Sequence, residues 1–468
     1  MGQLSVHICR CRAAVLLLAP LLLSGCIKGM FEGETNVLRP EIIKVKGHTD
    51  SPKPPLKEVC PVPEKPGPVA PQEISPKPCP PVEQKLLPQE LSPQSPEQLM
   101  PIPPPVSPKP PEKPQSCTPQ PPRLLAAAVT PDVAVSTTTL AEDVTWRGAV
   151  MISGVVTVAP QATLTIGPGT VVRFGGTGSV PGGGALLLVQ GRLVASGTKE
   201  KPILFTSRFA EPRKGDWQGI VMLGSEKKNL LENCRLEGAE TGLDVSFSSI
   251  TLKNVQVTRC GTGMHLQGTV AEASSGGASG CDVGMALADS EVELHDPLIS
   301  ENGSGVVAER SSLYLTGGAF SGNGSTGVKA TGCRVKIAAC TFAGNGAGLT
   351  LAASQGSVAA CRIAENADYG LTLAGSQVKV YGNEIGKNGK AGMRVEDGRG
   401  VAWGNSFVAN GGYDLVNDGP EDFRAMGNWW GDVPSAEIGK RIYDRQADGG
   451  RGRVIYSPAM EKKPAAMP

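Results

Sequence analysis

A repeat of 21 or 22 residues between Leu230 and Asp414 constrains the fold more than any other feature of this sequence. A glycine followed by a hydrophobic, a variable and a second hydrophobic residue returns at Gly242, Gly263, Gly284, Gly305, Gly327, Gly348, Gly370 and Gly392. An asparagine precedes each of the last five glycines by three or four residues, at Asn302, Asn323, Asn345, Asn366 and Asn388, and Asn410 continues the series where Asp414 replaces the glycine. Such a fixed period indicates a solenoid, in which each unit buries its apolar face only against its neighbours.

The composition of the repeat selects strands over helices. Gly, Ser, Thr and Val disfavour helices, and the L-x-x-L-x-L-x-x-N framework of leucine-rich repeats is missing. The sequence therefore predicts an all-β fold, a parallel β-helix with coils of 21–22 residues that forms one domain over residues 132–458. We expect the repeated glycines and asparagines to form a structural turn ladder. Both tolerate a positive φ, and stacked asparagine side chains can pass amide hydrogen bonds from coil to coil.

Residues 1–25 have the features of an export signal. Arg10 and Arg12 precede the apolar run 13–23, which is too short to span a bilayer and is typical of a signal-peptide core. The sequence Leu-Ser-Gly-Cys that follows resembles the lipobox of bacterial lipoproteins, which implies lipid attachment at Cys26. An ordinary signal peptide with an incidental cysteine is the alternative. Because Ile27 rather than aspartate follows, the resemblance implies a lipid anchor in the outer membrane, with the protein facing the periplasm or the cell surface.

Residues 26–131 differ sharply in composition from the rest of the chain. Of the 40 prolines, 27 lie between Pro52 and Pro131. A segment of this kind buries too little apolar surface to fold and favours polyproline II, so we predict a disordered tether. Docking of a partner on the Pro-rich run is the alternative. The odd number of cysteines within it (Cys60, Cys79 and Cys117) is compatible with an intermolecular disulfide, which leaves the oligomeric state open. We also predict a disordered tail over residues 459–468.

The two ends of the predicted domain resemble a known family. The opening segments are VTWRG (144–148), VTVAPQATLTIGPGTVVRF (156–174), LLLVQGRLVASGTKEKPILFTS (186–207) and GDWQGIVML (215–223), and the closing ones are AMGNWWG (425–431), IYD (442–444) and VIYSP (454–458). Together with the repeat, they resemble right-handed parallel β-helix proteins of the pectate-lyase-like superfamily. The resemblance implies the fold and says little about function. We expect Trp429 and Trp430 to cover the last coil, with sugar binding by this pair as the alternative.

Cysteines of neighbouring coils fall at equivalent positions of the repeat. Cys340 and Cys361 share one position, which Asn383 and Asn405 continue, and Cys260 and Cys281 occupy the position of the repeated asparagines. Stacked positions lie about 4.8 Å apart, within the range that a disulfide accepts. These four residues are therefore candidate disulfides, and small buried thiols are the alternative.

Tyr381 and Trp403 also occupy equivalent positions, with His295 further up the same column. An exposed aromatic pair of this kind is a candidate sugar platform, and an aromatic ladder without a ligand is the alternative. Neither C-x-x-C nor a Cys/His cluster is present, so we predict no metal site and no cofactor.

Enzymes with the fold that the resemblance implies act on acidic polysaccharides. The candidate acidic residues are Glu232, Glu237, Glu240, Asp244, Asp289, Glu291, Glu293 and Asp296. None of them forms a pattern typical of a lyase or a hydrolase, and Ca²⁺ is expected only under the lyase alternative. The main hypothesis is a binding or structural module of the cell envelope, directed at polysaccharide or cell wall. The alternatives are a polysaccharide lyase or glycoside hydrolase, and a module that binds a protein partner. With a net charge of +1 and no evident basic stripe, nucleic acid is not expected as a ligand.

Overall fold

The computed structural model describes residues 123–126, 130–175, 184–397 and 399–464. The predicted signal peptide 1–25, the lipidation site Cys26 and most of the predicted tether lie outside the described residues. Within the described ranges, no helix is both long and apolar enough to cross a membrane.

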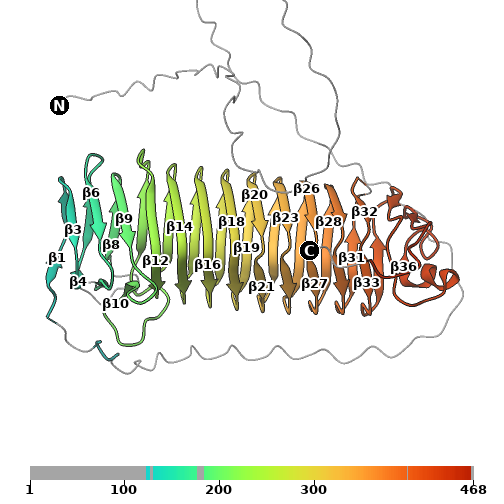
Figure 1. Cartoon of the computed structure of the whole chain (residues 1–468), viewed down its shortest axis with the longest axis horizontal. Helices are drawn as coiled ribbons and strands as arrows, with labels where there is room; N and C mark the ends of the chain where they lie inside the picture. Colours follow the sequence, from blue (N-terminus) through green and yellow to red (C-terminus); the bar gives the residue numbers. More distant parts are fainter. Residues whose placement is uncertain (1–122, 127–129, 176–183, 398, 465–468) are drawn as a thin grey trace, which may run out of the picture. The chain divides into compact units, whose positions relative to one another are not determined.

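The described chain winds into coils in which every strand pairs in parallel with the equivalent strand of the next coil (Figure 1). One sheet has 14 strands and runs along one side of the coils. Its strands are β2 (Thr138–Leu140), β5 (Val155–Val158), β8 (Leu186–Val189), β11 (Gly219–Leu223), β13 (Thr241–Ser246), β15 (Thr262–Gln267), β17 (Val283–Ala288), β19 (Ser304–Glu309), β22 (Thr326–Thr331), β25 (Ala347–Ala352), β28 (Tyr369–Ala374), β31 (Ala391–Val395), β34 (Tyr413–Asn417) and β36 (Ile442–Tyr443).

The second sheet has 23 strands and bends around a corner, so that it forms two sides of the coils. Its strands are β1 (Val133–Val135), β3 (Val144–Trp146), β4 (Ala149–Ile152), β6 (Thr163–Ile166), β7 (Val171–Phe174), β9 (Arg192–Ser196), β10 (Ile203–Ser207), β12 (Asn229–Glu237), β14 (Ser249–Thr258), β16 (Val270–Ser279), β18 (Glu291–Ser300), β20 (Ser312–Thr316), β21 (Ala319–Ser321), β23 (Arg334–Ala338), β24 (Thr341–Ala343), β26 (Gln355–Ala359), β27 (Arg362–Ala364), β29 (Gln377–Tyr381), β30 (Glu384–Gly386), β32 (Val401–Trp403), β33 (Ser406–Val408), β35 (Phe423–Arg424) and β37 (Val454–Ile455). The predicted parallel β-helix is confirmed.

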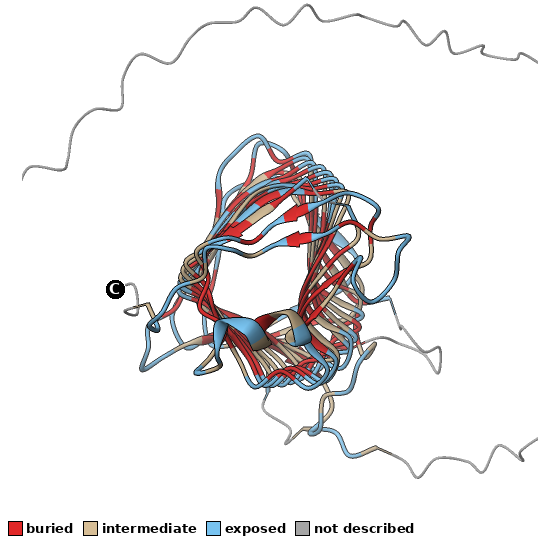
Figure 2. Ribbon diagram, turned by 90° about the vertical axis from the view of Figure 1, so that its right-hand side faces the viewer, coloured by how far each residue is buried: buried red, intermediate tan, exposed pale blue. Residues whose placement is uncertain are grey.

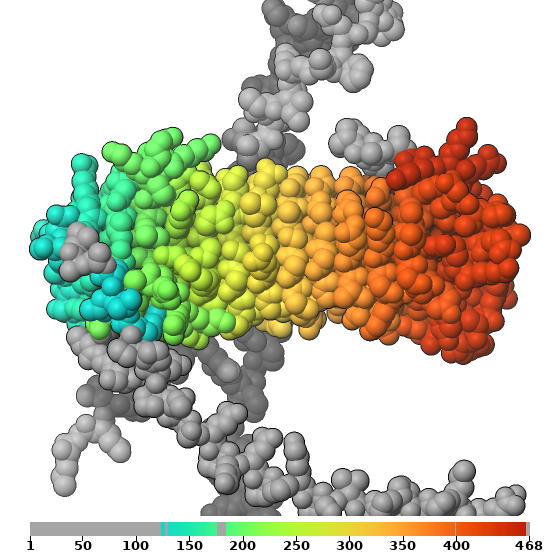
Figure 3. Space-filling view, turned by 90° about the horizontal axis from the view of Figure 1, so that it is seen from below, coloured from blue at the N-terminus to red at the C-terminus, as the bar shows by residue number. Residues whose placement is uncertain are grey.

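The core is a column of side chains inside the coils. Because side chains alternate along a strand, every second residue points inward, as Val335 and Ile337 do in β23. Figure 2 shows the buried residues on the inner side of the coils and the exposed residues on the outside and at the corners. Figure 3 shows an even outer surface over the yellow and orange coils.

The repeated glycines have a different role from the predicted one. They lie within strands, none of them has a positive φ, and the expectation of a left-handed conformation is wrong for them. A Cβ at Gly327 would lie 2.7 Å from the carbonyl oxygen of Gly348 and 3.3 Å from Asn345 Nδ2. Glycine is therefore required at this position because a side chain would collide with the neighbouring coil. The positive φ falls on the residue before each asparagine, at Glu301, Gly322, Gly344, Glu365, Lys387 and Ala409.

The asparagine ladder forms as predicted. The Oδ1 of Asn345 accepts hydrogen bonds from the backbone N–H of Asn323 (3.0 Å) and from its side-chain amide (2.9 Å), and the same pattern runs from Asn302 to Asn410. At its end, the amide of Asn410 donates to the buried carboxylate of Asp414 (2.9 Å), which pairs with Arg441. Asp414 therefore ends the ladder by replacing the next amide with a carboxylate.

The last coil is covered by aromatic side chains. Trp430 is buried and stacks on the core residue Phe407, with 4.7 Å between ring centroids, and Trp429 is buried beside it. Burial excludes this pair as a sugar platform. The one described helix, the 3₁₀ helix η1 (Ser435–Arg441), follows and contacts β34 and β36.

Short segments at both ends lie against the coils, where the sequence predicted disorder. Residues 123–126 contact the loop 208–216, and Arg123 pairs with Asp216 and lies over the ring of Phe209. At the other end, Lys463 pairs with Glu384 at 2.9 Å. The folded part therefore extends beyond the predicted boundaries of 132 and 458, and residues 465–468 lie outside the described residues.

Candidate functional site

One outer face carries unpaired positive charge. We define the charged face as the outward side chains of β23, β26, β29 and β32, together with Arg399, which lies two residues before β32. Its cations are Arg334, Lys336, Lys379 and Arg399, all of them exposed. None of these four forms an ion pair with another residue that the structure describes. The outward positions of the four strands hold no Asp or Glu, and the carboxylate of Asp397 lies at the adjoining corner beside Gly375.

The arrangement of these cations follows from strand register. Arg334 and Lys336 alternate with the buried Val335 and Ile337, so both point outward from β23. Lys336 is in register with Ser357, and Ser357 is in register with Lys379. Two coils therefore separate these lysines, which places their charges about 10 Å apart along the helix axis.

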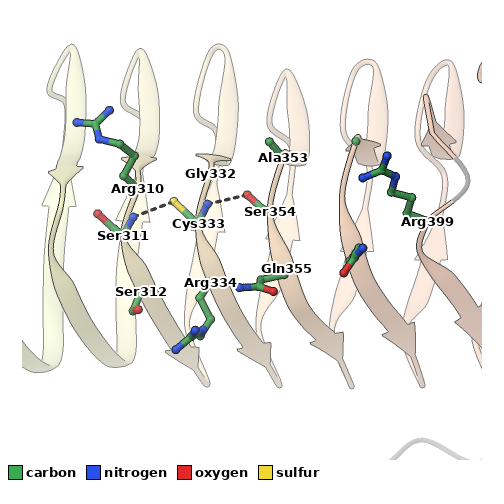
Figure 4. Close-up of a pocket in the computed structure, with 12 residues that line it drawn as sticks. Arg310, Ser311, Ser312, Gly332, Cys333, Arg334, Ala353, Ser354, Gln355 and Arg399 are labelled. Carbon is green, nitrogen blue, oxygen red and sulfur yellow. Dashed lines mark hydrogen bonds between the residues drawn. The ribbon is translucent and has the colours of Figure 1, made fainter. Parts of the chain in front are cut away.

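A groove of about 380 Å³ runs along the corner at which the charged face meets the 14-stranded sheet (Figure 4). Its corner positions in three successive coils are small: Gly332, Ala353 and Gly375. Arg310 lies at one end and Arg399 at the other, four coils apart, which corresponds to about 19 Å. The groove is therefore long enough to follow an extended chain.

Hydrogen bonds between coils hold the floor of the groove. The backbone N–H of Ser311 donates to the sulfur of Cys333 (3.4 Å), and the N–H of Cys333 donates to the hydroxyl of Ser354 (3.1 Å). Ser376 continues the ladder by accepting from the N–H of Ser354 (3.0 Å). The corner is thus fixed by buried groups, whereas the cations above it are free to contact a ligand.

The two arginines at the ends of the groove differ in charge compensation. Arg310 donates to both carboxylate oxygens of Asp289, at 2.8 and 2.9 Å, and contacts Glu309. This hydrogen bond lowers the pKa of Asp289 and raises the pKa of Arg310. Arg399 has no such partner among the residues described. The carboxylate of Asp397 lies at that end beside the groove residue Gly375, and no ion pair joins it to Arg399.

The predicted aromatic platform lies on the same face. Tyr381 and Trp403 are in register and stack, with ring centroids 4.9 Å apart and planes 12° apart. Trp403 is 40% exposed. The column before Tyr381 holds the small residues Ala359 and Ala338. The free face of the Tyr381 ring therefore has room beside it for a second ring.

The candidate acidic residues are distributed over several coils and both sheets. Glu237 accepts from Thr206 and Arg259, and Asp289 is bound by Arg310. Asp244 lies 2.9 Å from His265 on the outer side of the 14-stranded sheet. Glu291 and Glu293 point outward from β18, while Glu232, Glu240 and Asp296 lie on other coils or at corners. Among the described residues, no group of three or more His, Cys, Asp and Glu could hold a metal ion.

The charged face and the serine ladder were not predicted from the sequence. The signal was present as the alternation R-V-K at 334–336 and Q-V-K-V-Y at 377–381, which repeats in phase with the coils. A net charge of +1 concealed it, because the acidic residues lie on other columns. The four candidate disulfide residues are stacked in two pairs as predicted, and all of them are free thiols in the structure.

Two family models match the chain. The model described as a pectate-lyase like beta helix domain matches residues 137–261, and the one described as a right handed beta helix region matches residues 283–424. No curated protein matches the chain.

Several solved structures are similar to the chain at low identity. The A-module of the mannuronan C-5 epimerase AlgE6 from Azotobacter vinelandii is 15% identical, covers 68% of this chain and 91% of its own, and has a TM-score of 0.43. A mutant of the periplasmic alginate epimerase AlgG is 13% identical, with coverage of 68% and 76% and a TM-score of 0.35. The AlgE4 A-module, also from Azotobacter vinelandii, is 17% identical, with coverage of 56% and 86% and a TM-score of 0.40. The two family models and the parallel pairing of the strands show that the chain has a pectate-lyase-like right-handed β-helix fold.

Proposed function

We propose that this protein is a lipid-anchored protein of the cell envelope whose β-helix binds an acidic polysaccharide along the charged face. The observation that carries the proposal is the group of four uncompensated cations beside a groove and a stacked aromatic pair. The anchor is proposed from the sequence around Cys26, with the outer membrane as its location.

The spacing of the cations favours a polymer over a small molecule. Arg334 and Lys379 lie two coils apart, and Arg399 lies one coil further, so no compact ligand could contact all three. A chain of acidic sugars that runs along the helix axis would present one carboxylate after another to these side chains. Gln355 and Gln377 line the groove between them and can hydrogen-bond to sugar hydroxyls.

Arginine and tyrosine have separate roles in this proposal. The guanidinium groups of Arg334 and Arg399 can each bind a carboxylate with two parallel hydrogen bonds. The Tyr381 ring offers an apolar face to the C–H groups of a sugar ring, a contact that does not depend on charge. Charge therefore selects an acidic polymer, while the aromatic contact favours a carbohydrate over other polyanions such as nucleic acid.

The test is a binding titration of the full-length mature protein with alginate, polygalacturonate, single-stranded DNA and neutral dextran, at low and at high salt. We expect binding of the acidic polysaccharides, weakening as salt rises, and no binding of dextran. Lys379→Ala and Arg334→Ala should each cost about 1 kcal/mol, roughly fivefold in Kd. Tyr381→Ala should lower affinity by a similar factor at every salt concentration.

Lys329→Ala is the matched control, since Lys329 is an exposed cation on the 14-stranded sheet and lies outside the charged face. Its affinity should equal that of the unsubstituted protein. Equal affinity for dextran and alginate, or an equal loss in Lys329→Ala, would contradict the proposal. Tighter binding of DNA than of any polysaccharide would also reject it.

A second candidate function, a polysaccharide lyase or glycoside hydrolase, is favoured by one contact. Asp244 Oδ1 lies 2.9 Å from His265 Nδ1, and both side chains are about one-third exposed. A carboxylate in this position orients an imidazole for proton transfer. The same polymers should therefore be followed for chain shortening and for unsaturated products. Cleavage of a polymer that is abolished by Asp244→Asn or His265→Gln would establish this function. Polymers of unchanged length would contradict it, and only the binding function would remain.

A further inference from the structure

Six buried cysteines occupy corner positions in the described part of the chain, and all six are free. Each follows a residue with positive φ, as Cys340 follows Ala339 and Cys361 follows Ala360. Several equivalent positions in other coils hold Asn or Ser, which bond to the neighbouring coil. The cysteines therefore take part in the intercoil ladders, and their partners in the neighbouring coils decide what chemistry is open to them.

Four of the six face another cysteine. The backbone N–H of Cys260 donates to the sulfur of Cys281 at 3.4 Å, so this sulfur lies against the neighbouring coil. Cys340 and Cys361 directly precede Thr341 and Arg362, which are in register. Equivalent Cα atoms in neighbouring coils lie about 4.8 Å apart, within the 4.4–6.8 Å that disulfides span.

Each pair also contains one thiol prepared for ionisation. A hydrogen bond from the Cys260 thiol lowers the pKa of Cys281, and a hydrogen bond from the Cys361 thiol lowers the pKa of Cys340. The thiolate is the form that attacks a disulfide. Each pair thus combines a nucleophile with a second sulfur in contact with it.

The other two cysteines have no such partner. Cys333 lies between Ser311 and Ser354 in its ladder. Cys234 is in register with Ile203 on one side and Val255 on the other. Both are as buried as the paired cysteines, so they form an internal control that differs only in the neighbouring side chain.

We propose that Cys260–Cys281 and Cys340–Cys361 are sites of intercoil disulfides, while Cys234 and Cys333 remain thiols. The inference is independent of the proposed ligand. In each pair, the thiolate attacks the disulfide of an oxidised dithiol carrier and forms a mixed disulfide. The second thiol loses its proton, attacks this intermediate and releases the carrier as a dithiol. Two S–H bonds are replaced by one S–S bond, and the two electrons and two protons pass to the carrier. Because the sulfurs are buried in the finished coils, the exchange requires local opening of the corner that covers each pair.

The second pair lies at the end of the strands that carry the charged face. Cys340 follows β23 and Cys361 follows β26, the strands of Arg334 and Gln355. A covalent link at this point would hold the two central coils of the groove in register. The first pair lies at the start of the asparagine ladder, where Cys281 donates its N–H to Asn302. The two disulfides would therefore link neighbouring coils in the middle of the groove and at the start of the asparagine ladder.

The test is differential alkylation of the full-length mature protein isolated from an oxidising compartment. Thiols are blocked with iodoacetamide in denaturant without reductant, the protein is then reduced, and newly exposed thiols are labelled with N-ethylmaleimide. Peptide mass spectrometry assigns each label to its residue. We expect N-ethylmaleimide on the four paired cysteines and iodoacetamide on Cys234 and Cys333. A cross-linked Cys340–Cys361 peptide in the unreduced digest would identify the partners directly.

Variants make the result independent of labelling efficiency. In Cys340→Ser, Cys361 should change from the second label to the first, whereas Cys333→Ser should alter no other site. Reduction should lower the urea midpoint of the unsubstituted protein. In a variant that lacks all four paired cysteines, reduction should not change the urea midpoint. Iodoacetamide on all six cysteines would overturn the proposal, and so would protection of Cys333 equal to that of Cys340.

Discussion

The asparagine ladder makes a quantitative prediction at Asn345, which is buried in the middle of the coil stack. Its side chain forms four hydrogen bonds: Oδ1 accepts twice from Asn323, and Nδ2 donates to Phe320 O (2.9 Å) and to Asn366 Oδ1 (3.0 Å). Asn345→Ala removes all four and leaves the Asn323 N–H buried without a partner. At about 1 kcal/mol for each bond, the free energy of unfolding should fall by about 4 kcal/mol.

The measurement is urea unfolding followed by circular dichroism, combined with hydrogen exchange of the amide of Asn323. Asn345→Asp retains the volume of the side chain and loses the amide donor, so it separates hydrogen bonding from cavity formation. It should cost at least as much as the alanine. Thr350→Ala, on the outer side of β25, is the control and should change stability by no more than about 0.5 kcal/mol. A loss below about 1 kcal/mol for Asn345→Ala, or a mild effect of Asn345→Asp, would refute the reasoning.

Three further predictions follow from contacts at single sites. Gly327→Ala should destabilise the fold, because the new Cβ would lie 2.7 Å from a carbonyl oxygen, whereas Gly324→Ala meets nothing closer than 3.5 Å and should be tolerated; paired urea midpoints check this difference. Asp216→Asn should release Arg123 from its ion pair, so that trypsin cleaves after Arg123 faster than in the unsubstituted protein, as gel time courses would show; equal rates would argue against the contact. Burial raises the pKa of the Cys234 thiol to about 12. The contribution of this neutral thiol to the free energy of unfolding should therefore be complete below the ordinary pKa near 9 and should be lost as the pH rises toward 12. Alkaline unfolding of Cys234→Val should lack this pH-dependent loss of stability.

The fold could be predicted from sequence because a solenoid repeats one local solution many times. Each coil needs inward apolar residues at period two and a residue at each corner that accepts a positive φ. Both demands leave a trace every 21 or 22 residues. The role of Gly327 could not be predicted in the same way. Its requirement for space arises from Gly348 and Asn345, which are neighbours in the coil stack and are far from it in the chain.

The candidate site was harder to predict than the fold, because it has no period. Tyr381 and Trp403 were found since two aromatic residues at one phase of the repeat stand out. Arg334 and Lys379 were missed because each alone resembles an ordinary solvated residue of a strand. Their significance depends on which charges lie beside them, and register across several coils determines that. The charged face becomes visible in the sequence only when every outward position of the repeat is aligned coil by coil.

Inward and outward positions of a coil have different roles, and this difference explains why the charges on the outer face indicate a ligand. The inward residues and the corner ladders stabilise the fold, and neither includes Arg334, Lys336 or Lys379. Outward positions on neighbouring strands interact weakly, and like charges close together on a sheet are destabilising. Several cations without an acid on one face therefore slightly destabilise the folded state. Opposite charges were available, as Arg310 and Asp289 show one coil earlier. The four cations of the charged face have no such partner among the described residues, which is best explained if the missing negative charge is supplied by the molecule that binds there.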